Sequence, residues 1–152
     1  MAIDYMHGVL LGVQKLLLTL WFSSTYSNSH FSVFSKVEEI HDRLRQILPT
    51  SEIKRLPRSI SEHLTYWKAS ELRSFLLFYG LPTLYGLLPD NYFSHYTLFV
   101  HATFLLLQES ISEADLQEAD RLLDGFCKSF TSLIRRLQIF ETAVESVEML
   151  GC

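Results

Sequence analysis

Residues 67–107 read WKASELRSFLLFYGLPTLYGLLPDNYFSHYTLFVHATFLLL, and this stretch decides the fold because it is too apolar to remain in water. Pro89 and Asp90 divide it, since a proline ends one helix and an aspartate favours the first turn of the next. The pattern predicts a central helical hairpin with a kink at 80–82, where a glycine and a proline lie close together. We expect the flanking helices to pack against this hairpin.

On both sides of the central stretch, apolar residues recur at intervals of three and four, which is the periodicity of amphipathic helices. These intervals predict helices over 6–22, over 35–48 with Ser35 as N-cap, and from about Ile111 to Arg136. The polar segments 23–32 and 50–66 are predicted to be loops. The expected fold class is all-α, with about five helices in an irregular bundle. Residues 1–137 would form a single helical domain, followed by a divergent tail over 138–152 that weakly continues a helical pattern.

The composition fits one globular domain. Of the 152 residues, 48% are hydrophobic and 20% are charged, which excludes a disordered chain. The net charge of -4 gives no overall attraction to nucleic acid, so a DNA contact would need a local basic patch. No apolar run reaches the roughly 20 residues of a membrane span, and no positive region precedes the first apolar run as in a signal peptide.

The two cysteines are too few and too far apart for a disulfide framework or a zinc site. We expect Cys127 to be a small buried apolar residue. This cysteine usage favours a reducing compartment, the nucleus or the cytoplasm.

Two small clusters have residue types that could carry function. Asp4 and His7 stand at the start of the first predicted helix, where a carboxylate can face a divalent cation such as Mg²⁺, although spacing alone favours an N-cap aspartate. Lys54, Arg55 and Arg58 form a basic cluster that could contact phosphates, the alternative being a solvated loop.

Other polar residues are expected to have structural roles. His95 and His101 lie six apart on one predicted helix, so they do not share a face as a metal pair would, and we expect core or boundary histidines. The acidic residues of 109–124 are expected to form the solvated face of the last helix. The sequence contains no glycine-rich phosphate loop and no Gly-x-Ser-x-Gly elbow, so an autonomous hydrolase is not expected.

Six segments follow one another in an order typical of a known family. They are DYMHGVLLGV at 4–13, KVEEI at 36–40, RLPRSI at 55–60, YWKASELRSFLLFY at 66–79, LLPDNY at 87–92 and SISEADL at 110–116. The similarity as a whole covers roughly Ile3 to Leu133, most of the chain. In this order the chain resembles the transposases of the CACTA (En/Spm-like) group and the proteins derived from them in animal genomes.

The resemblance implies a function in DNA transposition. The family is of the DDE type: an RNase H-like core whose acidic residues hold two divalent metals, Mg²⁺ or Mn²⁺, for strand cleavage and transfer. Asp4 matches one of those acidic residues, and the helices after it resemble the helical insertion of that core. The first catalytic aspartate would precede Asp4 and the final glutamate would follow the helical region, so a single carboxylate is matched. An N-terminal helix that belongs under the sheet of that core would leave an apolar face uncovered.

We therefore expect a transposase-derived fragment without autonomous catalysis and without a cofactor of its own, which retains DNA or protein binding. Its expected partners are DNA, the remaining segments of a transposase, or a second copy, and no membrane. Two alternatives remain open. One is a free-standing helical interaction module, and the other is part of a metal-dependent strand transferase that is active only with the missing segments.

Overall fold

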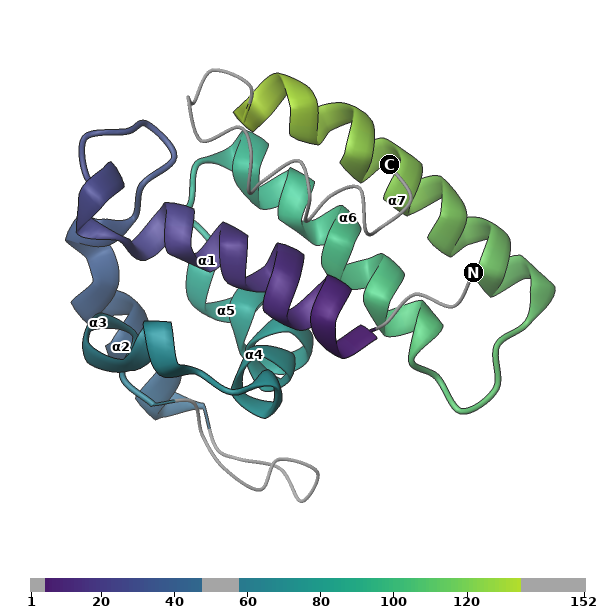
Figure 1. The fold of residues 1–152 in the computed structure, drawn as a ribbon, viewed down its shortest axis with the longest axis horizontal. Helices are drawn as coiled ribbons and strands as arrows, with labels where there is room; N and C mark the ends of the chain where they lie inside the picture. The colour runs from purple at the N-terminus through teal and green to yellow at the C-terminus, as the bar shows by residue number, and fades with distance from the viewer. Residues whose placement is uncertain (1–4, 48–57, 135–152) are drawn as a thin grey trace.

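The structure is a computed structural model that describes residues 5–47 and 58–134 of the chain. Within these two ranges the fold is all-α, with helices packed in a bundle and no β-strand (Figure 1). The predicted fold class is therefore confirmed. The predicted tail over 138–152 lies outside the described residues, as do residues 50–57 of the predicted loop.

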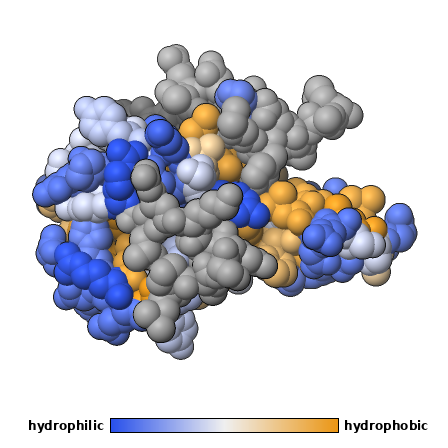
Figure 2. All heavy atoms as spheres, turned by 90° about the horizontal axis from the view of Figure 1, so that it is seen from below, coloured by the Kyte–Doolittle hydropathy of each residue, from blue (hydrophilic) through white to orange (hydrophobic). Residues whose placement is uncertain are grey.

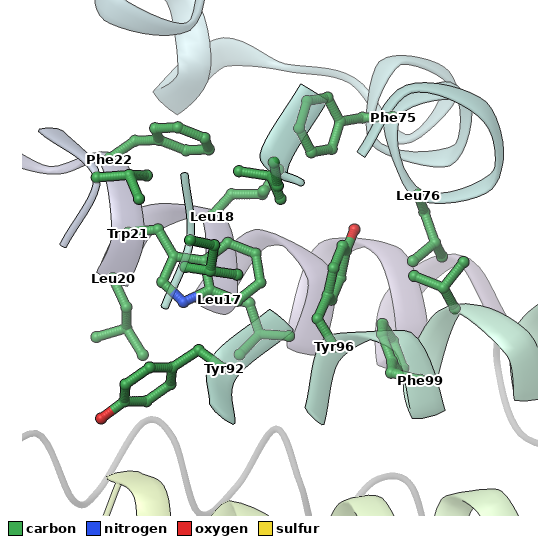
Figure 3. Packing of buried hydrophobic residues seen from close by; sticks show 14 of the residues in the cluster. Leu17, Leu18, Leu20, Trp21, Phe22, Phe75, Leu76, Tyr92, Tyr96 and Phe99 are labelled. Atoms are coloured by element: carbon green, nitrogen blue, oxygen red, sulfur yellow. The ribbon is translucent and has the colours of Figure 1, made fainter. Parts of the chain in front are cut away.

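One continuous helix opens the described chain and changes its winding part-way. It is π-helical in η1 (Tyr5–Gln14) and α-helical in α1 (Lys15–Phe22). The predicted helix over 6–22 is thus present. Between His7 and Phe22, Leu11 is the large apolar side chain that remains exposed, so the expectation of an uncovered apolar face is wrong. The reason is that α4 packs against η1 and that α6 also reaches this helix, where Trp21 packs edge-on against Tyr96 at 4.9 Å between ring centroids (Figure 3).

Short helical turns lead from this helix to the next one. η2 (Ser24–Tyr26) and η3 (Phe34–Lys36) are 3-10 turns, and α2 (Val37–Gln46) follows directly. The N-cap of α2 is Lys36, and its side chain makes no capping bond, so the prediction of Ser35 as N-cap is wrong. The 3-10 turn is the cause, because it places Ser35 inside η3.

The segment before and within the central stretch is more broken than predicted. α3 (Ile60–His63) and η4 (Leu64–Tyr66) occupy part of the predicted loop. α4 (Ala69–Ser74), the π-helical η5 (Phe75–Tyr79) and α5 (Gly80–Leu84) then follow without a break.

The change of winding at Gly80 coincides with the predicted kink, and Gly80 is required there by a close approach. A Cβ atom at this position would lie 2.9 Å from the backbone oxygen of Phe75 and 3.1 Å from the hydroxyl of Tyr96.

The last two helices form the hairpin of the molecule. α6 (Asp90–Leu106) begins after Pro89 as predicted, and α7 (Glu113–Ile134) runs beside it (Figure 1). The predicted hairpin between the two halves of 67–107 is wrong, since α6 packs far more extensively on α7 than on η5 and α5. Small side chains explain this pairing: Ala102 and Ala119 are buried between α6 and α7 and let the helices approach closely.

The larger of the two buried clusters in the described ranges joins helices from both ends of the described chain. Its largest fully buried side chains come from η5, α6 and α7: Tyr79, Tyr96, Phe75, Phe99 and Phe126. Figure 3 shows how α1, η5 and α6 contribute side chains to one interior. The central stretch thus supplies much of the core, as its composition predicts.

Candidate functional site

Of the four predicted site residues, Arg58 lies within the described ranges. Asp4, Lys54 and Arg55 lie outside the described ranges, so metal binding at Asp4 and phosphate binding at the two basic residues stay predictions. His7 is exposed. Across residues 5–47 and 58–134, no three side chains of the metal-ligating types gather in one place.

Arg58 forms a two-point ion pair with Glu71, across a gap of 13 residues. Its Nε donates to Oε1 at 2.7 Å and its Nη2 donates to Oε2 at 3.0 Å. Nη2 also donates to the backbone oxygen of Tyr66 at 2.5 Å. The carboxylate is buried, with 5% of its side chain exposed, whereas Arg58 keeps 36% of its side chain exposed. Such a fork geometry fixes both partners more firmly than a single contact does.

Two further hydrogen bonds complete this arrangement. The backbone N–H of Lys68 donates to Oε2 of Glu71 at 2.7 Å, which caps the start of α4. The indole Nε1 of Trp67 donates to the backbone oxygen of Arg58 at 3.1 Å, and the Trp67 ring is buried. The hydrogen bonds from Arg58 lower the pKa of Glu71 to about 2, against an ordinary 4.5. We call Arg58, Glu71, Trp67 and Lys68 the Arg58–Glu71 cluster.

His41 ties the chain just after Arg58 to α2. Its Nε2 accepts a hydrogen bond from the backbone N–H of Ile60 at 2.7 Å, and the side chain is buried. An accepting Nε2 requires the neutral imidazole. Burial lowers the pKa of His41 and so favours that neutral form.

His95 is buried in the core. This agrees with the prediction that it is a core or boundary histidine. Its ring stacks on Phe126 at 4.2 Å between centroids, and its Nε2 lies 2.9 Å from the backbone oxygen of the same residue. Since a carbonyl can only accept, Nε2 donates this bond. Burial lowers the pKa of His95. His101 is exposed on the same helix, so the two histidines do not form a site together.

Sequence reasoning missed an apolar surface at the end of the α6–α7 hairpin. Phe104 and Leu107 at the end of α6, and Ile111 and Leu116 at the start of α7, are between 37% and 50% exposed. We call these four residues the hairpin patch. The signal was hidden because residues 98–107 are almost uniformly apolar, so periodicity does not reveal which side chains face water. The acidic residues beside the patch are solvated, as predicted.

Cys127 departs from its prediction. It is half-buried in α7 and is disulfide-bonded, so the expectation of a small buried apolar residue is wrong.

Comparison with protein-family models, with curated proteins and with solved structures gives no match. Among the described residues, none of the helices combines the length and the apolar character needed to cross a bilayer.

Proposed function

We propose that this chain is a helical region derived from a CACTA-type transposase, which does not cut DNA by itself and acts by binding protein or DNA. The observation that carries the proposal is the Arg58–Glu71 cluster. Its four residues come from the segments 55–60 and 66–79, both of which belong to the resemblance to the family, and the start of 66–79 is, together with 4–13, its more specific part. The cluster supports the proposal that the helical region is inherited from a transposase. It gives these motif residues a structural role, which would be retained in a protein without catalysis.

The inability to cut DNA by itself follows from the number of matched carboxylates. Two-metal phosphodiester chemistry needs several acidic ligands around the ions. Asp4 is the one residue of this sequence that matches a catalytic acid of the family. The proposal concerns these 152 residues alone, and the alternative of a strand transferase completed by other segments is tested by supplying them.

A cleavage assay tests the proposal. The chain is incubated with Mg²⁺ or Mn²⁺ and with labelled duplexes that carry transposon ends, and cleavage and strand transfer are followed on gels. We expect no product. Metal-dependent activity that disappears in Asp4→Ala, but persists in Asp42→Ala, would refute the proposal. Asp42 is a matched control because it is an exposed helical aspartate whose ion pair in the structure is with its near neighbour Arg45.

DNA binding through Lys54, Arg55 and Arg58 is a second candidate function, favoured by the clustering of these three cations. The Arg58–Glu71 pair changes how it must be tested, since Arg58→Ala would also leave a buried carboxylate unpaired. The double variant Lys54→Ala/Arg55→Ala leaves the pair intact. We expect salt-sensitive binding that weakens in this double variant, and unchanged affinity would rule out the basic cluster as the DNA contact.

A further inference from the structure

The hairpin patch gathers exposed apolar surface at one end of the molecule. Half of the large apolar side chains that are exposed in the described residues belong to it, and Phe104 alone is 50% exposed. Figure 2 shows hydrophobic surface toward the α6–α7 end, with hydrophilic side chains at its outer edge. Scattered apolar side chains are ordinary on a protein surface, but a gathered patch marks a contact surface.

Local structure holds the patch in a fixed shape. The Oγ of Ser112 accepts from the backbone N–H of Asp115 at 3.0 Å, and the Asp115 carboxylate accepts from the backbone N–H of Ser112 at 3.2 Å. This reciprocal cap places Ile111 and Leu116 at the two positions that pair in a hydrophobic staple. Phe104 and Leu107 are three apart at the end of α6 and so lie on neighbouring positions. Phe104 and Leu116 therefore lie within the two helices, while Leu107 and Ile111 flank the short connection between them.

The surroundings of the patch are negatively charged. Residues 109–120 contain five acidic side chains and no basic one. The hydrogen bonds from Ser112 lower the pKa of Asp115, which keeps this carboxylate ionised. The first nearby cation, Arg121, is already bound to Glu118, with its Nη2 2.6 Å from Oε1. The helix dipole of α7 explains why acids are favoured in its first turn, but it does not explain the exposed apolar residues between them.

We propose that the hairpin patch is a docking site for a basic amphipathic helix of a partner protein. Such a helix offers apolar anchors on one face, which would cover the four patch residues, and Lys or Arg side chains beside them, which would meet the acidic rim. A second copy of this chain is disfavoured because it would bring two acidic rims together, and DNA is disfavoured by the same repulsion. The inference rests on the proposed binding function but not on the proposed ancestry.

Two synthetic helices test this inference against the full chain. Each has about 18 residues and the same leucine face, and they differ in carrying Lys and Arg or Glu on the polar face. Binding of each labelled peptide is measured by fluorescence anisotropy. The test variants are Phe104→Ser/Leu116→Ser and Glu109→Gln/Glu113→Gln. Phe34→Ser is the matched control, since Phe34 is exposed to a similar degree, at 42%, on η3. Circular dichroism verifies that each variant is folded.

We expect the basic helix to bind, and its affinity to fall at least about tenfold in Phe104→Ser/Leu116→Ser and to change less than about twofold in Phe34→Ser. Binding should also weaken with added salt and in the Glu109→Gln/Glu113→Gln variant.

Equal binding of the acidic helix, an equal loss in Phe34→Ser, or no binding by either helix would overturn the inference. Self-association that disappears in Phe104→Ser/Leu116→Ser, seen by analytical ultracentrifugation, would assign the patch to a second copy instead. If the basic peptide does not bind while duplex DNA still binds, the docking site is refuted and the proposed binding function is not. Metal-dependent DNA cleavage would refute the proposed function and leave the peptide result standing.

Discussion

The buried carboxylate of Glu71 should make the protein sensitive to acid, and Glu71→Gln is the perturbation that isolates it. The glutamine keeps the shape of the side chain but removes its charge. The pKa of Glu71 falls from an ordinary 4.5 to about 2 in the fold. At about 1.4 kcal/mol for each pKa unit, this difference sets an upper limit of roughly 3 kcal/mol on the stabilisation near neutral pH. Because Arg58 is 36% exposed and partly screened by solvent, we expect about 2 kcal/mol.

The pH dependence has a definite sign. The pKa of Glu71 is lower in the folded than in the unfolded state, so the unfolded state binds more protons between the two values. The stabilisation is therefore complete above pH 4.5 and is lost as the pH falls from there toward 2. In Glu71→Gln the protein should be less stable near neutral pH, and this contribution to its acid sensitivity should be absent.

Urea unfolding followed by tryptophan fluorescence, from about pH 7 to about pH 3, measures both effects. Trp67 reports directly on the cluster, since it is hydrogen-bonded to Arg58. Arg58→Ala should cost more, about 3 kcal/mol, because it leaves the buried carboxylate without its cation. Glu62→Gln is the control, an exposed glutamate whose removal should change stability by less than about 0.5 kcal/mol. Wild-type stability and an unchanged acid slope in Glu71→Gln would refute the reasoning.

Three further predictions concern the core. The lowered pKa of His95 means that stability falls as the pH drops below 6.5, and His95→Leu should remove part of that loss in thermal unfolding across this range. Gly80→Ala should lower the free energy of unfolding by about 1–3 kcal/mol because its Cβ would meet backbone 2.9 Å away, whereas Gly125→Ala, with a 3.7 Å contact, should raise it by up to about 1 kcal/mol. Tyr79→Phe removes a buried hydroxyl that has no hydrogen-bond partner among the described residues and should be neutral or stabilising in urea unfolding; a loss above about 1 kcal/mol would show that the hydroxyl is bonded.

Local patterns in the sequence predicted the elements whose signals are local. The apolar repeat of α7 depends on residues three or four positions apart, and the start of α6 depends on the adjacent Pro89 and Asp90. Both elements are present in the structure. The π-helical winding of η1 and η5 was not predictable in this way, since apolar periodicity does not distinguish a widened turn from an α-helical one. The choice of α7 as the partner of α6 depends on which of several apolar faces has small side chains at the crossing, which is a tertiary property.

In the candidate site, too, local features could be predicted from the sequence and tertiary contacts could not. The basic cluster was visible in the sequence because its members are adjacent, but the pairing of Arg58 with Glu71 joins two segments that no periodicity connects. A basic residue in a polar loop therefore looked free to bind phosphate, although its guanidinium holds a buried carboxylate. The roles of Asp4, Lys54 and Arg55 stay predictions, since these residues lie outside the described ranges.

The hydrogen bond from the Tyr96 hydroxyl to the side-chain oxygen of Gln14 has a consequence for the order of folding. It joins residues 82 positions apart, at 3.0 Å, whereas α6 and α7 are neighbours in the chain. Closing a long loop must precede the gain from such a distant contact, and a local hairpin avoids most of that entropy loss. We therefore expect α6 and α7 to pair early, and the helix of η1 and α1 to dock last during folding and to detach first on unfolding.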